Sequence, residues 1–272
     1  LFAMPKTHLA DLTVRPVLDG KNAFLEVEAQ IGCEFPAPDS ALVTMQLLDF
    51  DGRKVLPRPL SETVNWKRQV HSSKRGVATF RVKVPRCRLW SAESPSLYTV
   101  DISVKDGKSE SCISVRTGFR SIEVRGGDLL INGRRVLIFG VNRHSHDDVH
   151  GRAVPRERML EDIRLMKRFH FNAVRCSHYP PDPYWLELCD EHGLYVIDEA
   201  DAESHDFHNA LCRDPRYASA WLDRAMRMVQ RDKNHASVIL WSLGNESGYG
   251  PNHDAAAGWI RHTDPSRPLH YE

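Results

Sequence analysis

The chain has 272 residues, with 37 basic and 36 acidic side chains and a hydrophobic fraction of 41%. This composition is typical of a globular protein and excludes a largely disordered one, because the apolar fraction is ordinary and the formal net charge is only +1. The balance of charges gives no electrostatic sign of nucleic-acid binding, and no apolar run approaches the roughly 18 residues of a membrane span. Because the chain opens at Leu1 without a basic start and an apolar stretch, we expect a cytoplasmic protein with no signal peptide and neither a nucleic-acid nor a membrane partner.

From about residue 8 to residue 117, apolar residues alternate with polar ones. The period of two is clearest in segments 25–31, 43–47, 80–84 and 98–104. Such alternation indicates strands with one buried face and one wet face. Short strands at this spacing suggest an immunoglobulin-like β-sandwich. We therefore predict such a domain over residues 1–117, with a packing or spacer role.

From about Asp128 the pattern changes to strands that alternate with amphipathic helices. The expected strands are 136–141, 171–176, 194–200 and 238–243, with a fifth beginning within 268–272, and the expected helices are 155–170, 183–192, 218–232 and 252–262. This order predicts a parallel sheet. Each strand ends in polar residues, and the carboxyl ends of barrel strands carry the active site. We therefore predict a multi-domain β plus α/β chain in which residues 118–272 form an incomplete (β/α)₈ TIM barrel.

The end of the fourth expected barrel strand carries the most specific chemistry. Glu246 follows the string Trp241 to Asn245, at the point where an apolar strand breaks into a loop. We expect its carboxyl group to be partly shielded from water, which favours the protonated form and suits a general acid. Asn245 beside it can hydrogen-bond a sugar hydroxyl. This pairing is what a glycosidase needs to protonate the leaving oxygen and hold the sugar.

The other strand ends carry candidate metal ligands and sugar contacts. Glu203 and His205 are two residues apart, which in an extended segment places both side chains on one side. With Glu246 they could hold a divalent ion, although spacing alone slightly favours solvated surface residues. His144 and His178 end the first two strands, and we expect them to hydrogen-bond sugar hydroxyls.

A different enzyme class is an alternative for the first strand end. His144-Ser145-His146 resembles the metal site of amidohydrolases, which hydrolyse amides or esters with zinc-type ions. That class also takes His and Asp ligands from later strands, and it leaves the Gly-Asn-Glu string unexplained. A metal-dependent amidohydrolase-type hydrolase is therefore the weaker alternative.

Taken together, the motifs resemble glycoside hydrolase family 2, and most closely the long β-galactosidases of the bacterial lactose-cleaving type. The strings that carry the resemblance are 89–95 (LWSAESP), 117–120 (TGFR), 140–144 (GVNRH), 171–180 (FNAVRCSHYP), 198–200 (DEA) and 241–248 (WSLGNESG). The resemblance extends over nearly the whole chain.

The resemblance implies hydrolysis of terminal non-reducing β-D-galactose residues by retaining double displacement, with a β-galactoside such as lactose as substrate and a homo-oligomeric parent enzyme. The residues it implies are Glu246 as acid/base, His144, His178 and Asn245 as substrate contacts, and Glu203, His205 and Glu246 as ligands of Mg²⁺, with Mn²⁺ also acceptable. The family's nucleophile, a second Glu on a later barrel strand, would lie beyond residue 272. The 272-residue chain alone is therefore expected to be inactive, and a sugar-binding or polypeptide-binding piece is the alternative function.

Overall fold

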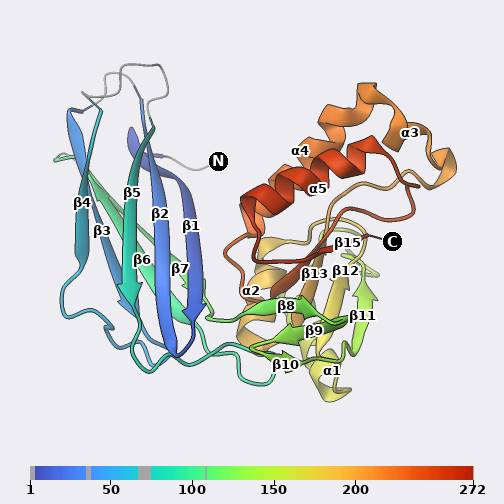
Figure 1. Ribbon diagram of the computed structural model, residues 1–272, viewed down its shortest axis with the longest axis horizontal. Coiled ribbons are helices and arrows are strands. Elements are labelled where there is room, and N and C mark those ends of the chain that lie inside the picture. Colours follow the sequence, from blue (N-terminus) through green and yellow to red (C-terminus); the bar gives the residue numbers. More distant parts are fainter. Residues whose placement is uncertain (1–3, 35–37, 67–74, 108, 272) are drawn as a thin grey trace. The chain divides into compact units, whose positions relative to one another are not determined.

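The structure is a computed structural model that describes residues 4–34, 38–66, 75–107 and 109–271 (Figure 1). Its internal contacts divide the chain into two compact units. The first unit is Leu1–Arg88 with Ser96–Phe119, and the second is Leu89–Pro95 with Arg120–Glu272. Within the described ranges, no helix is both long and apolar enough to cross a membrane.

The first unit is a sandwich of two antiparallel sheets, with the strand orders β1-β2-β5 and β4-β3-β6-β7. Its strands are β1 (Thr7–Asp19), β2 (Asn22–Cys33), β3 (Ser40–Leu48), β4 (Leu60–Asn65), β5 (Arg75–Lys83), β6 (Tyr98–Lys105) and β7 (Glu110–Thr117). Both sheets contribute alternate side chains to one core, among them Leu25, Met45 and Ile102. The predicted sandwich is confirmed, and its cause is the period-two pattern. The sequence pattern missed β4, because that edge strand buries only Val64.

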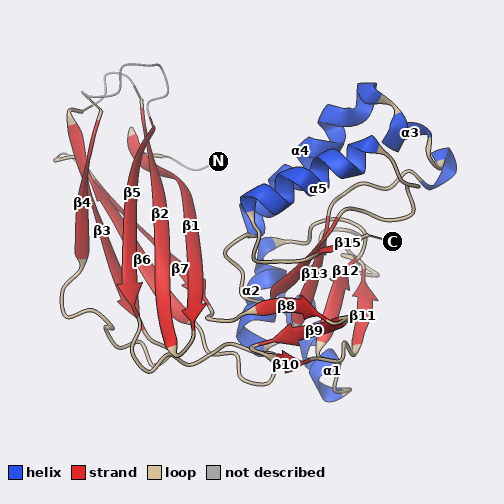
Figure 2. Cartoon of the chain, in the orientation of Figure 1, coloured by secondary structure: helices blue, strands red, loops and turns tan. Residues whose placement is uncertain are grey.

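The second unit is built on a parallel sheet with the order β11-β12-β13-β14-β15 (Figure 2). Its strands are β11 (Gly140–Arg143), β12 (Ala173–Cys176), β13 (Tyr195–Glu199), β14 (Val238–Ser242) and β15 (Leu269–His270). The α-helices are α1 (Arg156–Arg168), α2 (Pro183–His192), α3 (Ala210–Arg213), α4 (Ala218–Asp232) and α5 (Pro251–Thr263). The predicted order of strands and helices is confirmed as the start of a TIM barrel, although Glu272, the last residue of the fifth expected strand, lies outside the described residues.

Local signals explain why two helices have the bounds that the sequence predicts. The side chain of Asp182 accepts the backbone N–H of Tyr184 at the start of α2, and Gly193 closes that helix in the left-handed conformation. In α4, Trp221, Ala225 and Met228 form the buried stripe that its periodicity indicates. The helices pack these stripes into one core with the sheet.

The first barrel strand begins later than predicted. The expected strand 136–141 is instead β11 at Gly140–Arg143, and Leu137 and Phe139 are exposed. The reason is a side chain: the Asn172 amide accepts the N–H of Phe139 at 2.8 Å and donates to the carbonyl of Leu137 at 2.9 Å. These bonds take the place of a strand ladder before Gly140.

A small antiparallel sheet precedes the barrel strands and was not predicted. It consists of β8 (Ile122–Arg125), β9 (Asp128–Ile131) and β10 (Arg134–Arg135). Gly126 and Gly127 both have positive φ angles in the turn between β8 and β9. Its strands are only two to four residues long, which is too short for an alternating pattern to be recognised.

Candidate active site

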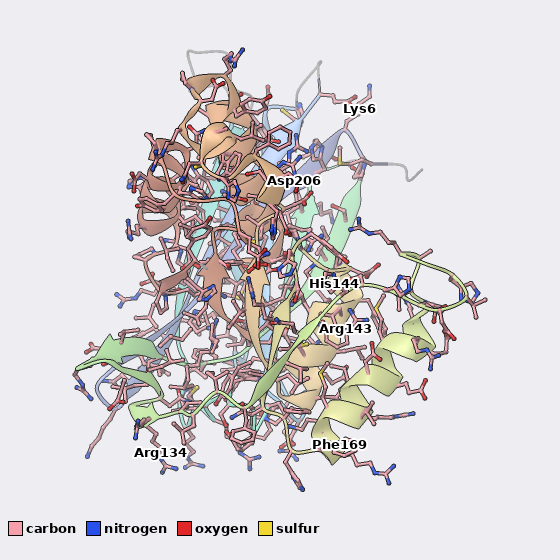
Figure 3. All side chains as sticks on the ribbon, turned by 90° about the vertical axis from the view of Figure 1, so that its right-hand side faces the viewer. Lys6, Arg134, Arg143, His144, Phe169 and Asp206 are labelled. Carbon is pink, nitrogen blue, oxygen red and sulfur yellow. The ribbon has the colours of Figure 1, made fainter. Side chains whose placement is uncertain are left out.

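The predicted site residues all follow strands of the parallel sheet at its carboxyl edge. His144 follows β11, His178 follows β12 and Glu246 follows β14. Figure 3 labels Arg143 and His144 where β11 runs into its loop. Because parallel strands end on the same side, residues more than 100 positions apart in sequence meet at one rim.

A buried carboxylate, Glu199 at the end of β13, organises this rim. It is fully buried and accepts bonds from Arg175 Nε, His178 Nδ1 and Ser242 Oγ, each at 2.7 Å. Arg175 also donates from Nη2 to Asn245 Oδ1 at 2.8 Å. Two predicted sugar contacts, His178 and Asn245, are therefore linked through one buried hydrogen-bond network.

The two predicted histidines lie side by side. The rings of His144 and His178 have centroids 5.2 Å apart in an edge-to-face arrangement. Tyr179 supports the pair, because its hydroxyl lies 3.4 Å from His144 Nδ1 and accepts the backbone N–H of Ser145 at 3.2 Å. The peptide bond between Ser177 and His178 is cis.

The loop that presents Glu246 depends on unusual backbone conformations. Gly244 has φ +134°, and a Cβ there would lie 2.3 Å from the carbonyl oxygen of Ala202. Glu246 itself has φ +39°, in the left-handed region that non-glycine residues rarely adopt. Such a conformation costs of order 1–3 kcal/mol and persists only where surrounding contacts impose it.

Ser247 provides those contacts. Its side chain is fully buried, and its hydroxyl lies 2.8 Å from the Asn245 carbonyl and 3.1 Å from the Ala202 carbonyl. The same oxygen accepts the N–H of Ser204 at 2.8 Å. From the other side, the Tyr271 hydroxyl accepts the N–H of Ser247 at 3.1 Å. The loop after β14 is thus fixed to the loop after β13.

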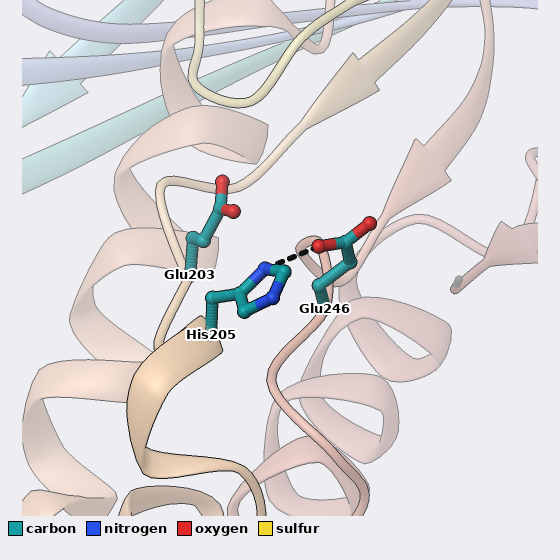
Figure 4. Close-up of side chains that lie close together, drawn as sticks. All are labelled: Glu203, His205 and Glu246. Carbon is teal, nitrogen blue, oxygen red and sulfur yellow. Dashed lines mark ion pairs between the residues drawn. The ribbon is translucent and has the colours of Figure 1, made fainter.

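Glu203, His205 and Glu246 converge on one point. Each offers a ligand atom, and these atoms all lie within 4.8 Å of one another. Figure 4 shows the three side chains facing each other, with an ion pair between His205 Nδ1 and Glu246 Oε2. All three residues are exposed, so water has access to the group.

These residues fit a hard divalent cation. Two carboxylates and one imidazole suit Mg²⁺ or Mn²⁺, and the exposed position leaves room for the waters that Mg²⁺ retains. Two ligands of one Mg²⁺ are separated by at most about 4.2 Å, since each lies about 2.1 Å from the ion. Small rotations of exposed side chains would bring the widest pair into that range.

Comparisons with known proteins identify the family. Residues 7–120 match the family described as "Glycosyl hydrolases family 2", and residues 122–272 match "Glycosyl hydrolases family 2, TIM barrel domain". The chain belongs to glycosyl hydrolase family 2. The resemblance seen in the sequence is thereby confirmed at family level.

A curated relative and two solved structures illustrate the match. A protein named beta-galactosidase from Alteromonas mediterranea is 43% identical over 277 aligned residues, which cover 100% of this chain and 26% of that protein. A family 2 member from Bacteroides cellulosilyticus has a TM-score of 0.82 at 22% identity, covering 98% of this chain and 35% of that one. A Parabacteroides merdae beta-glucuronidase has a TM-score of 0.80 at 24% identity, covering 98% and 34%. The structural matches establish the fold.

The exposure of Glu246 and the backbone at His205 bear on two expectations about this family 2 site. The Glu246 side chain is 51% exposed, so only about half of it is shielded from water. Glu203 and His205 do converge, but not by alternation along an extended segment, since a 3₁₀ turn (His205–Phe207) begins at His205.

The amidohydrolase alternative is wrong. Among the described residues, the metal-ligating groups that gather in one place are Glu203, His205 and Glu246, and neither His144 nor His146 joins them. The family match also accounts for the Gly-Asn-Glu string that the alternative left unexplained.

Sequence reasoning recognised Arg175 and Glu199 as polar residues at strand ends but assigned them no role in holding the site of this family 2 chain together. Arg175 is 8% exposed within β12, and a charged residue in an otherwise apolar strand signals a buried partner. Asp198 and Glu199 are charged residues at the end of the apolar strand β13, and the same reasoning would have predicted buried positions for them. Nothing in the local pattern marks Ser247 or Tyr271, because Ser247 bonds to Ser204, 43 residues away, and to Tyr271, 24 residues away.

Proposed function

We propose that the enzyme to which this chain belongs hydrolyses terminal β-D-galactosides, such as lactose, with retention of configuration and with Glu246 as the acid/base. The observation that carries the proposal is the exposed carboxylate of Glu246 on a fixed loop, beside Asn245 and on the same rim as His178. The similarity to a protein named beta-galactosidase supports the galactoside class.

Glu246 has two roles in this mechanism. In the first displacement its carboxyl group gives a proton to the glycosidic oxygen, while a second carboxylate attacks the anomeric carbon and the leaving alcohol departs. In the second, Glu246 as carboxylate takes a proton from the water that attacks the glycosyl-enzyme bond. The attacking carboxylate is the Glu that the family resemblance places beyond residue 272.

We further propose that Glu203, His205 and Glu246 hold Mg²⁺, with Mn²⁺ as an acceptable substitute. When bound, such a cation supplies positive charge beside the Glu246 carboxylate and orders water. Asn245 and His178 are held by the buried hydrogen-bond network of Arg175 and Glu199. They orient the sugar hydroxyls relative to Glu246 and the cation.

The test is the stereochemistry of the full-length enzyme. NMR of the first-formed sugar from an aryl β-galactoside should show the β-anomer, and an α-anomer would overturn retention. An aryl β-glucuronide serves as the second substrate, because the solved relatives include a protein named beta-glucuronidase. Faster hydrolysis of the glucuronide than of the galactoside would overturn the substrate class.

The role of Glu246 is tested with Glu246→Gln. General acid or base catalysis contributes about 10²–10⁴-fold, so kcat on unactivated galactosides should fall by that factor. On an aryl galactoside whose leaving group needs no proton, added azide should restore turnover and give β-galactosyl azide. Azide that yields the α-azide would instead identify Glu246 as the nucleophile.

A further inference from the structure

Glu199 has no route to a substrate. Its side chain is fully buried, and both oxygens are occupied: Oε1 by His178, and Oε2 by Arg175 and Ser242. The guanidinium of Arg175, which can only donate, bonds to Oε2 at 2.7 Å, and its positive charge favours the carboxylate over the neutral acid. A carboxylate can only accept hydrogen bonds.

This acceptor fixes the proton on His178. The ring nitrogen that faces Glu199 Oε1 at 2.7 Å is Nδ1, so Nδ1 must carry the hydrogen. In the neutral ring, Nε2 then has no proton and accepts hydrogen bonds. The His178 side chain is 21% exposed, which leaves part of the ring open at the rim.

The same network fixes the amide of Asn245. A guanidinium group can only donate, so the amide atom that faces Arg175 Nη2 at 2.8 Å is the oxygen. The NH₂ group is left to point elsewhere, and it lies 3.3 Å from Glu203 Oε1. Asn245 is thus oriented as a donor toward the rim.

We infer that Glu199 is a positioning residue that sets the hydrogen-bond polarity of the sugar site, with His178 Nε2 as an acceptor and Asn245 Nδ2 as a donor. The inference rests on the proposed function only in treating these two groups as sugar contacts. A hydroxyl that meets His178 must donate, and a hydroxyl that meets Asn245 must accept.

The direct test is the tautomer of His178 in the 272-residue chain. Long-range ¹H–¹⁵N NMR of the imidazoles at pH 8.5, where an ordinary imidazole is neutral, distinguishes a protonated from an unprotonated ring nitrogen. The His178 signals are assigned by their loss in His178→Asn. We expect a protonated Nδ1 and an unprotonated Nε2. A protonated Nε2, with or without a proton on Nδ1, would overturn the inference.

Glu199→Gln then separates positioning from simple packing. Gln has nearly the same shape but can donate as well as accept, so we expect His178 to gain the Nε2–H form. The His235 ring, whose Nδ1 faces Asp190 Oδ2 at 2.6 Å, is the internal control, and its signals should not move. An unchanged His178 tautomer in a folded variant would overturn the inference.

A second measurement uses the full-length enzyme instead of the 272-residue chain. If Glu199 acts through His178, the losses in kcat/KM for Glu199→Gln and His178→Asn should not add in the double variant. Fully additive losses would contradict the coupling. Because the tautomer is measured without turnover, failure of the galactosidase proposal and failure of this inference remain distinguishable.

Discussion

At the scale of single residues, Gly244 determines where the loop that carries Glu246, the proposed acid/base, can lie. Its φ of +134° and the 2.3 Å approach of a Cβ to the Ala202 oxygen leave no space for a side chain. Gly244→Ala should therefore destabilise the chain by roughly 2 kcal/mol or more, because an incompatible backbone angle and a steric clash add. Urea unfolding measures the change.

Gly258 is the matched control for this substitution. It lies inside α5, and a Cβ there would meet nothing within 4 Å. Gly258→Ala should leave stability unchanged or raise it by up to about 1 kcal/mol, the helix preference of Ala over Gly. Equal effects at the two positions would show that the contact with Ala202 is not what constrains the loop.

The proposed metal ligands give the second prediction at this scale. Glu203→Gln replaces a charged ligand by a neutral one, so Mn²⁺ affinity, measured by electron paramagnetic resonance on the 272-residue chain, should fall. The loss should exceed the roughly tenfold that even an outer-shell partner typically costs. Glu123→Gln, an exposed change on β8, is the control. Equal Mn²⁺ affinity of both variants would show that Glu203 is not a metal ligand.

Which residues reach the rim could be predicted from the sequence, but how they are held there could not. His144, His178 and Glu246 each follow an apolar strand, and a parallel sheet brings such positions to one edge. The position of Glu246 depends on the left-handed backbone at that residue and on the hydrogen bonds of its neighbour Ser247 with Ser204 and Tyr271. Those contacts join distant segments, and no local pattern encodes them.

At the scale of elements, α2 and α4 were predicted with their observed bounds because their signals are local. The cap at Asp182, the closing Gly193 and the stripe of α4 are all readable within one turn or one helix. The start of β11 was not, because it is decided by the side chain of Asn172, which follows α1. The apolar residues before Gly140 would start the strand earlier, but Asn172, 33 positions from Phe139 in sequence, bonds to their backbone instead.

Strand β13 carries a buried acid whose ionisation should affect stability. Asp198 is fully buried, and burial, followed by the charge of nearby Asp232, raises its pKa well above the ordinary value. The unfolded chain ionises Asp198 at about pH 3.9, so its contribution to stability is full below that pH and is lost as pH rises toward the raised pKa. Asp198→Asn should flatten this decline, as measured by urea midpoints between pH 4 and pH 8.

Asp264 provides the control of opposite sign. Burial alone would raise its pKa, but the charge of Arg267 and bonds from Ser266, Trp241 and Arg267 hold it below the ordinary range. Its contribution to stability is therefore present above about pH 3.9 and is lost as pH falls. Asp264→Asn should lose stability at neutral pH. A decline with rising pH that persists in Asp198→Asn would exclude Asp198 as its source.

At the scale of the whole molecule, the sequence predicted two architectures but not the membership of every segment. The string 89–95 resembles the sandwich part of the family, and the family match over residues 7–120 includes it. In the structure its contacts are with the second unit: Trp90 is fully buried, donates to the Asp190 carbonyl at 2.9 Å and packs edge-on against Tyr195. The burial of the large Trp90 side chain thus places the segment in the second unit, although the residues on both sides of it in sequence belong to the first. Only the tertiary structure shows which core receives this indole.

Turnover by the 272-residue chain is the last prediction, and it depends on which carboxylates surround Glu246. Retaining hydrolysis needs a second carboxyl group about 5–5.5 Å from the acid, on the opposite face of the sugar. Among the described acids that end or follow β13, Asp198 and Glu199 are fully buried, Asp201 pairs with Arg224 at 2.8 Å, and Glu203 is one of the three proposed metal ligands. None of them is free to attack an anomeric carbon. We therefore expect no aryl β-galactoside turnover above the background given by Glu246→Gln. A rate of about 1 s⁻¹ or more, within the ordinary enzymatic range, that Glu246→Gln abolishes would show that a nucleophile lies within these residues.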